Sequence, residues 1–183
     1  MTSKSVAKPE LYSVYPVTSL LIYNGVTVLH YLAGGLGLVL GYGALVGGLL
    51  GAAYLFFAFG QMYIWMPLKV CPNCVYYHLE GSRCISGLNL VARKMAGPGV
   101  VKNFASRAEG LLCPNNLYLA SFILPLVLIL PALVLSFGLL LLGIWLTLVG
   151  LLLVRMFVIF RKVACAHCRA KNICPNAQAM GLG

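Results

Sequence analysis

The sequence contains no aspartate and only three glutamates among its 183 residues. Pairs of carboxylates, which are common general acids and bases in enzymes, are therefore scarce. No glycine-rich phosphate loop follows a strand-like segment either. The sequence gives no basis for assigning an enzymatic activity, and we expect a protein without catalytic residues.

Charge of either sign is also scarce. Charged residues make up 9% of the chain and hydrophobic residues 61%, whereas soluble domains are about 25% charged. This composition, with a mean hydropathy of +0.95, excludes an ordinary soluble domain and is typical of an integral membrane protein. We interpret the net charge of +10 as contact with the anionic lipids of the inner leaflet. Without an aromatic and basic recognition module, we expect no nucleic-acid binding.

Long charge-free segments indicate how the chain crosses the membrane. Nothing from 11 to 68 or from 110 to 154 is formally charged. One span needs about 20 residues, so each segment has room for two. Breaks are expected at Gly41–Gly43 and at 136–138. The sequence therefore predicts an all-α membrane protein with four transmembrane helices in two hairpins, at 17–40, 43–66, 117–135 and 139–160.

The basic residues predict the orientation of the chain. All lysines and arginines except Arg155 lie outside the predicted spans, and none lies at a hairpin tip. By the positive-inside rule, both termini and the long loop are cytoplasmic, in a multi-pass protein of the inner cell membrane. The predicted parts are an N-terminal segment (1–16), a hairpin (17–66), a cysteine-rich loop (67–116), a second hairpin (117–160) and a cysteine-rich tail (161–183).

Glycines recur every fourth residue in the first hairpin. Gly37 and Gly41 form one set, and Gly43, Gly47 and Gly51 form another. Such spacing produces a flat groove where a second helix can approach closely. The sequence does not show whether that helix belongs to the same chain or to a second copy.

Apolar residues in the long loop recur with a helical period. The two apolar faces, separated by Gly97–Gly99, predict two short helices that lie at the lipid headgroups. A docking surface for a protein partner is the alternative. The two faces consist of Ile85, Leu88, Val91 and Met95, and of Val101, Phe104, Ala108 and Leu111.

All seven cysteines lie outside the predicted spans, on the cytoplasmic side, where thiols are kept reduced. Two Cys-x-x-Cys pairs stand out, and each is followed by a third cysteine. Two thiolates at that spacing can occupy two corners of a tetrahedral metal site. With one histidine, the seven cysteines supply eight ligands, enough for two sites. The candidate metal ligands are Cys71, Cys74, Cys84, Cys113, Cys165, Cys168, Cys174 and His78.

Two arrangements of these ligands remain open. In the first, each pair and its third cysteine form a separate site, with His78 or Cys113 completing the first one. In the second, the pairs Cys71/Cys74 and Cys165/Cys168 share one site that joins the two hairpins. Both pairs leave predicted helices on the same membrane face, so the sequence does not distinguish these arrangements.

Zinc is the metal that this ligand set favours first. An iron–sulfur cluster is the alternative, although the bacterial ferredoxin spacing is absent. Redox-active dithiols without metal are a further alternative, but no thioredoxin-like pattern surrounds either pair. The cysteines therefore predict a cytoplasmic metal-binding cap.

Polar residues inside the predicted spans are candidates for a second site, because they are costly in a bilayer. Asn24, Gln61 and Arg155 lie at similar depth and could line a quinone or lipid pocket, and His30 lies deeper. The alternative is that they pack against one another and Arg155 extends to the headgroups.

Three functions are consistent with these features. We expect first an accessory or anchor subunit with a zinc cap, interacting with a protein partner or with a second copy of itself. The alternative is an electron-transfer subunit with an iron–sulfur cluster and a quinone. A soft-metal transporter fits less well, because no cysteine lies within a span.

Overall fold

The computed structural model describes residues 10–182, and the regular secondary structure in this part of the chain is helical, without a β-strand. Three helical runs in it are long and apolar enough to cross a membrane. They are Val17–Asn73, Pro114–Leu135 and Leu139–Ala164.

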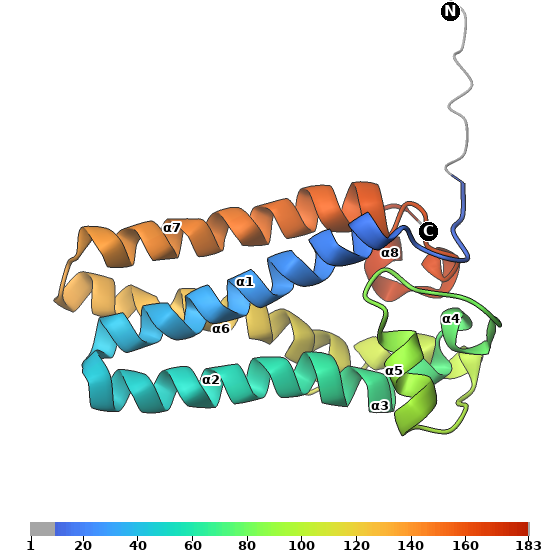
Figure 1. The fold of residues 1–183 in the computed structure, drawn as a ribbon, viewed down its shortest axis with the longest axis horizontal. Coiled ribbons are helices and arrows are strands. Elements are labelled where there is room, and N and C mark those ends of the chain that lie inside the picture. Colours follow the sequence, from blue (N-terminus) through green and yellow to red (C-terminus); the bar gives the residue numbers. More distant parts are fainter. Residues whose placement is uncertain (1–9, 183) are drawn as a thin grey trace, which may run out of the picture.

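The first run is folded back on itself. Helix α1 (Val17–Tyr42) ends at Gly43, whose φ of 78° and ψ of 175° reverse the chain. The reversal lies within the break predicted at Gly41–Gly43. Because of it, α1 and the segment that follows lie side by side and antiparallel (Figure 1). That segment consists of η1 (Gly43–Gly47), α2 (Gly48–Gly60), η2 (Gln61–Trp65), α3 (Met66–Lys69) and η3 (Cys71–Asn73).

The other two runs form a second antiparallel pair. Helix α6 (Pro114–Leu135) and helix α7 (Leu139–Leu153) are joined by a turn at 136–138, as expected, and α7 continues as the wider helix η5 (Val154–Ala164). Helix α6 begins three residues before the predicted start at 117. The reason is local: Pro114 fits the first helical position, and the Cys113 sulfur accepts a hydrogen bond from the Asn116 amide.

The remaining elements gather at one end of the molecule, opposite the two turns (Figure 1). We call this the loop end, formed by residues 10–16, 70–113 and 165–182. The helix expected near 85–95 is present as α5, and the one expected near 101–111 is a 3₁₀ helix, η4. Leu88 and Phe104 are buried, whereas Val91 and Met95 of the same predicted faces are exposed. The loop end contains α4 (Val75–His78), α5 (Leu88–Met95), η4 (Val101–Ala108), η6 (Lys171–Ile173) and α8 (Pro175–Ala179).

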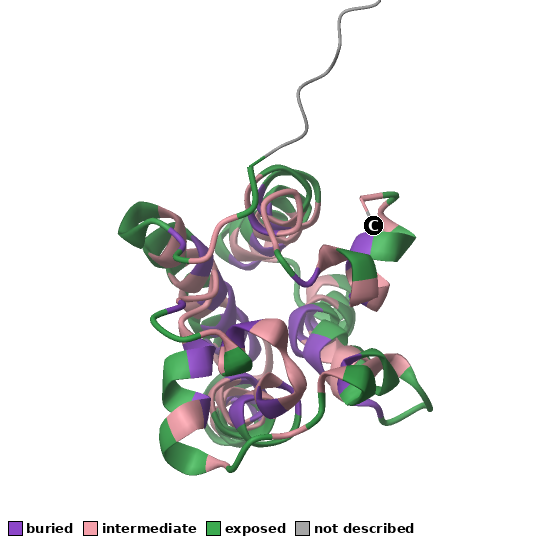
Figure 2. Ribbon diagram, turned by 90° about the vertical axis from the view of Figure 1, so that its right-hand side faces the viewer, coloured by how far each residue is buried: buried purple, intermediate pink, exposed green. Residues whose placement is uncertain are grey.

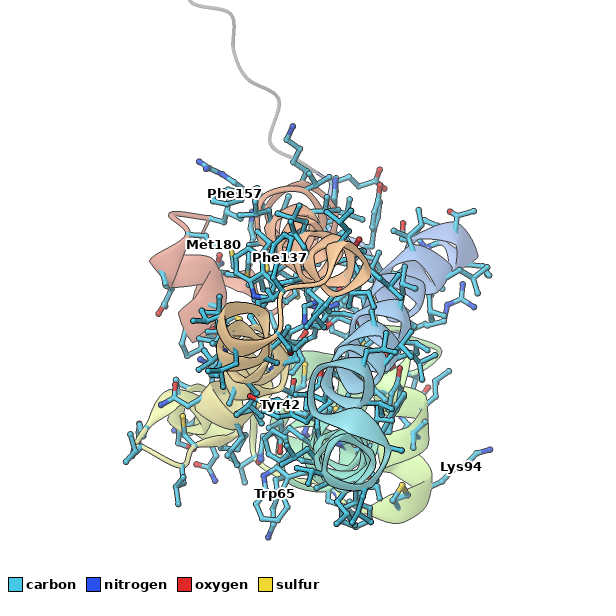
Figure 3. All side chains as sticks on the ribbon, turned by 90° about the vertical axis from the view of Figure 1, so that its left-hand side faces the viewer. Tyr42, Trp65, Lys94, Phe137, Phe157 and Met180 are labelled. Carbon is cyan, nitrogen blue, oxygen red and sulfur yellow. The ribbon has the colours of Figure 1, made fainter. Side chains whose placement is uncertain are left out.

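Apolar side chains cover the outside of the long helices. Phe56 and Leu135 are each 84% exposed, and the labelled Trp65 and Phe157 also lie on the outside of the bundle (Figure 3). Buried residues face inward (Figure 2), and several of them are polar, among them Thr27. This inside-out distribution suits a surrounding solvent of lipid.

The glycine groove packs against helices of the same chain. A Cβ atom on Gly47 would lie 2.5 Å from the Leu38 carbonyl oxygen of α1, and one on Gly51 would lie 2.9 Å from the Gly35 carbonyl oxygen. On the other face of α1, Gly37 lies against Ile129 of α6. The close approach predicted from the glycine spacing is thus used within one chain.

A tyrosine hydroxyl group compensates for Pro125 of α6. Pro125 has no N–H to donate to the carbonyl of Ser121, four residues earlier. That carbonyl instead accepts a hydrogen bond of 3.0 Å from the Tyr54 hydroxyl of α2. Nearby, the Tyr42 hydroxyl donates to the Leu128 carbonyl at 2.6 Å. The first bond satisfies the carbonyl that Pro125 leaves without a helical donor, and both bonds hold α6 against the first helical pair.

Candidate functional site: a cavity lined by cysteines

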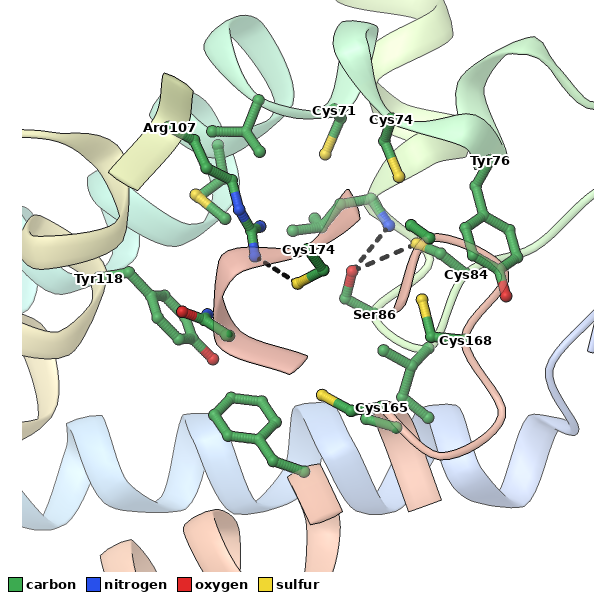
Figure 4. A pocket seen from close by; sticks show the side chains of 18 of the residues that line it. Cys71, Cys74, Tyr76, Cys84, Ser86, Arg107, Tyr118, Cys165, Cys168 and Cys174 are labelled. Atoms are coloured by element: carbon green, nitrogen blue, oxygen red, sulfur yellow. Dashed lines mark hydrogen bonds between the residues drawn. The ribbon is translucent and has the colours of Figure 1, made fainter. Parts of the chain in front are cut away.

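Six of the seven cysteines line a single cavity at the loop end, with a volume of about 160 Å³. Their sulfur atoms face a common space, with the two Cys-x-x-Cys pairs on opposite sides of it (Figure 4). We call it the cysteine cavity. None of the six is disulfide-bonded. The six are Cys71, Cys74, Cys84, Cys165, Cys168 and Cys174.

The first pair lies on a tight turn at the end of the first helical run. The Cys74 amide donates to the Cys71 carbonyl at 3.0 Å, and Pro72 fixes the backbone between them. The Pro72 carbonyl accepts a hydrogen bond from His78 Nε2 at 3.0 Å. Because a carbonyl only accepts, Nε2 carries the proton there, and His78 supports the turn.

The second pair lies on a similar turn directly after η5. The Cys168 amide donates to the Cys165 carbonyl at 3.2 Å. His167, inside this turn, points elsewhere: its ring stacks on Tyr12 and its Nδ1 bonds the Glu10 carbonyl at 2.8 Å. The two halves of the chain thus present equivalent turns to the cavity.

A buried asparagine positions the third cysteine of the first half. Asn89 is 1% exposed, and its Oδ1 accepts from the Cys84 amide at 3.1 Å. Its Nδ2 donates to the Ser82 carbonyl at 2.9 Å and to the Tyr76 carbonyl at 3.2 Å. One side chain therefore connects three backbone positions of the loop.

Replacing Asn89 with alanine should destabilise the loop end. The change leaves buried backbone groups without partners, at a cost of about 2–3 kcal/mol. We expect the midpoint of thermal unfolding of the detergent-solubilised protein to fall by about 5–10 °C. The exposed Asn103 offers a matched control, since Asn103→Ala should change the midpoint little. Equal midpoints for the two variants would contradict this role of Asn89.

The N-terminal segment joins the two cysteine segments. The Tyr12 amide donates to the His167 carbonyl at 3.0 Å, and the Tyr15 amide donates to the Arg83 carbonyl at 2.9 Å. The buried Tyr15 hydroxyl donates to the Ala164 carbonyl, at the end of η5. Residues 12–15 thus bridge the loop and the tail, a role with no signal in the spacing of the sequence.

Arg107 brings a positive charge to the cavity wall. Its guanidinium donates to the Cys174 sulfur at 3.0 Å and lies 4.5 Å from the centre of the Phe104 ring. Its Nε is buried without a hydrogen-bond partner. A fixed positive charge therefore lies in contact with one sulfur of the cavity.

Burial raises the pKa of several thiols of the cavity. Desolvation raises the pKa of Cys74 to about 12, that of Cys165 to about 12 and that of Cys168 to about 11. Neighbouring cysteines add to the increase, and Arg107 reduces it for Cys74 and Cys165. Nucleophilic and redox-active cysteines have lowered pKa values. The raised pKa values of Cys74, Cys165 and Cys168 favour the neutral thiol form of these three side chains in the metal-free protein.

The seventh cysteine lies outside the cysteine cavity. Cys113 is 4% exposed, and its sulfur caps the first turn of α6. Neither Cys113 nor His78 lines the cavity. The structure thus brings together six of the eight predicted ligands.

The four polar residues of the predicted pocket do not line the cavity either. Asn24 donates to the Leu20 and Ser86 carbonyls, and Gln61 donates to the Pro114 carbonyl at 3.0 Å. His30 Nε2 bonds the Phe122 carbonyl at 3.0 Å, while its Nδ1 is buried without a partner. Arg155 is enclosed by aromatic rings. Each of the four is held by its own neighbours.

The chemistry of the cavity wall points to soft metal ions, because its donors are sulfur atoms. Within residues 10–182, no three His, Cys, Asp or Glu side chains form a ready-made site for one ion. The six sulfurs surround a space instead of meeting at one point (Figure 4). No family model, curated protein or solved structure matches the chain.

Proposed function

We propose that this chain is a membrane protein with four spans in two hairpins, whose cysteine cavity binds zinc through thiolates. In this proposal it serves as an accessory or anchor subunit of a membrane complex. One observation carries it: cysteine pairs about 90 residues apart in the sequence line the same cavity. A metal bound there would tie the loop to the tail and hold the two hairpins together.

The arrangement of the helices supports four spans. Helix α1 has 26 residues, which at 1.5 Å per residue is about 39 Å, longer than the ~30 Å core of a bilayer. The chain then turns back at Gly43, so the first run supplies two crossings. α6 and the α7–η5 helix supply the other two.

The distribution of basic residues supports a cytoplasmic loop end. The described lysines and arginines other than Arg155 belong to the loop end or to the adjoining helix ends, where they would meet anionic headgroups. The apolar Leu111 and Leu112 in the same region are 86% and 77% exposed. They suit contact with a lipid surface or with a partner subunit.

The metal proposal is tested by elemental analysis of the full chain purified in detergent without chelators. We expect stoichiometric zinc in a colourless protein. Replacing both Cys165 and Cys168 with serine should abolish zinc binding and release the tail, so that trypsin cleaves after Arg169 and Lys171 faster. Cys113→Ser should keep its zinc. A metal-free wild-type protein would overturn the proposal.

The orientation is tested separately in membrane vesicles. An antibody should reach an epitope tag at the C-terminus only in inverted vesicles, and a tag after Gly138 only in right-side-out vesicles. Equal access to both tags from one side would contradict the four-span arrangement.

An iron–sulfur electron-transfer subunit is the second candidate. The observation that favours it is the floor of the cavity, where Tyr23, Tyr118 and Phe160 continue into the aromatic interior of the bundle. A quinone bound beside such a layer could exchange electrons with a cluster in the cavity. Anaerobically purified protein that is brown and contains iron and labile sulfide would establish this candidate and displace zinc.

A further inference from the structure

We infer that the cysteine cavity holds two metal ions bound by all six thiolates, with two sulfurs shared between the ions. This inference rests on the proposed function and adds to it the number of ions and the full ligand set. The two halves of the chain contribute equally, because each supplies a Cys-x-x-Cys turn and one further cysteine.

The number of sulfurs fits two ions better than one. A single tetrahedral zinc ion takes four thiolates, which the two pairs alone would supply. Cys84 and Cys174 would then remain as spare thiols in the wall of the same cavity. Two tetrahedral ions need eight coordination positions, and six sulfurs supply eight when two of them bridge. Cys113, which caps α6, is left out of this set.

The size of the cavity agrees with this count. One water molecule needs about 10–15 Å³ of cavity volume, and the cysteine cavity has about 160 Å³. One ion with sulfurs at about 2.3 Å would fill only a small part of that space. The space is thus large enough for more than one metal atom, and the thiols would move inward to bind, because no three of them meet at one point among residues 10–182.

Arg107 places a cation at one of the six sulfurs. Arg107 donates to the Cys174 sulfur at 3.0 Å. Two divalent ions with six thiolates carry a net charge of −2. A fixed cation at the wall offsets part of this charge, so Arg107 is a positioning residue for the centre.

Polar neighbours also hold Cys84 in place. Its amide is bonded to the buried Asn89, and its sulfur lies 3.4 Å from the Ser86 hydroxyl oxygen. Both third cysteines therefore have a polar side chain at the sulfur, a neighbour that a metal-bound thiolate can use as a hydrogen-bond donor.

The test is a count of metal ions in the full chain. We expect two zinc ions per chain by elemental analysis, and two cadmium ions after exchange, seen as mass increments of the intact protein in native mass spectrometry. Cys84→Ser and Cys174→Ser should each reduce the count below two, whereas Cys113→Ser should retain both ions. The wild-type count decides the question even if a serine variant fails to fold.

Arg107 provides an independent readout. Arg107→Gln should weaken zinc binding by about 10-fold or more in competition with a chromophoric chelator. Arg107→Lys should recover part of the affinity, and the exposed Lys102 gives the control Lys102→Gln, which should bind as wild type does.

The outcomes separate this inference from the proposed function. One zinc ion per chain, kept by the Cys84→Ser and Cys174→Ser variants, would overturn the two-ion centre and leave the proposed function intact. Iron with labile sulfide would overturn it in favour of a cluster. A wild-type protein without metal would overturn the proposed function itself.

Discussion

The Gly47→Ala variant should lose much of the stability of the bundle. A Cβ atom at Gly47 would lie 2.5 Å from the Leu38 carbonyl oxygen and 2.7 Å from the Val39 carbonyl oxygen. Both are backbone atoms of α1, so relief requires η1, which contains Gly47, and the α2 helix that continues it to move away from α1. Overpacking of this kind costs about 3 kcal/mol, and the midpoint of thermal unfolding in detergent should fall by about 6–12 °C.

Gly48→Ala is the matched control, because it places the same methyl group one residue later. A Cβ atom on Gly48 would have nothing within 4 Å. Alanine there should raise stability by up to about 1 kcal/mol, since glycine is a weak helix former. Circular dichroism during heating would compare the two variants. If both unfolded at the same temperature, the close packing of α1 on α2 would be wrong.

The packing of the helices was largely predictable from the sequence. Charge-free segments revealed which residues are apolar enough for a membrane, and glycine spacing indicated a surface for close approach. The break before Gly43 was predictable because glycine accepts a positive φ without strain. These features repeat along the chain or depend on one residue type, so periodicity and composition are sufficient to detect them.

The assembly of the cysteine cavity was only partly predictable. The two Cys-x-x-Cys pairs identified four of its sulfurs, but the sequence left open whether the two halves meet. Their meeting depends on hydrogen bonds between distant segments, such as those from Tyr12 and Tyr15 to the tail and the loop. Such contacts leave no pattern in the sequence, because any backbone carbonyl can accept them.

Two predicted metal ligands, Cys113 and His78, lie outside the cysteine cavity, because one caps a helix and the other bonds the backbone. Cys113 was a candidate metal ligand because the seven cysteines and one histidine supply eight ligands, enough for two sites. In the structure its sulfur caps α6. His78 has workable ligand spacing from Cys74, but its ring supports the turn at Pro72. Spacing alone cannot distinguish a ligand from a residue that shapes the backbone beside it.

The predicted pocket of polar residues illustrates the same limit. Asn24, Gln61 and Arg155 lie at similar positions along their helices, and that is all that a sequence can show. Asn24 and Gln61 bond backbone carbonyls of the loop and of α6, whereas Arg155 points into the aromatic interior. Side chains at the same depth in the membrane can point in different directions around their helices, so equal depth does not bring them together.

Arg155 is therefore the residue whose replacement should have the second large effect. It is 1% exposed, although its guanidinium lacks a carboxylate partner among residues 10–182. The Cζ atom of its guanidinium lies 4.5 Å from the Tyr23 ring centre and 4.3 Å from the Phe122 ring centre. The rings of Tyr118 and Phe160 complete the enclosure.

Hydrogen bonds connect this arginine to the cysteine cavity. Its guanidinium donates to the Tyr118 hydroxyl and, at 2.6 Å, to the Thr27 hydroxyl. The Tyr118 hydroxyl lies 3.0 Å from that of Tyr23, and both tyrosines line the cavity. A cation beneath the floor of the cavity thus holds the Tyr118 hydroxyl, which in turn contacts that of Tyr23.

Arg155→Ala should lower stability by about 3 kcal/mol, because it leaves a void between four aromatic rings and removes desolvated cation–π contacts. The midpoint of thermal unfolding should fall by about 6–12 °C. Arg161→Ala, at an exposed position of the same helix, should change it little.

Arg155→Met fills the space without the charge and so separates packing from electrostatics. If the methionine variant is as stable as wild type and keeps its metal, the charge contributes nothing, and volume alone explains the burial of Arg155. If it is stable but binds metal more weakly, the positive charge beneath the tyrosines acts on the centre above them.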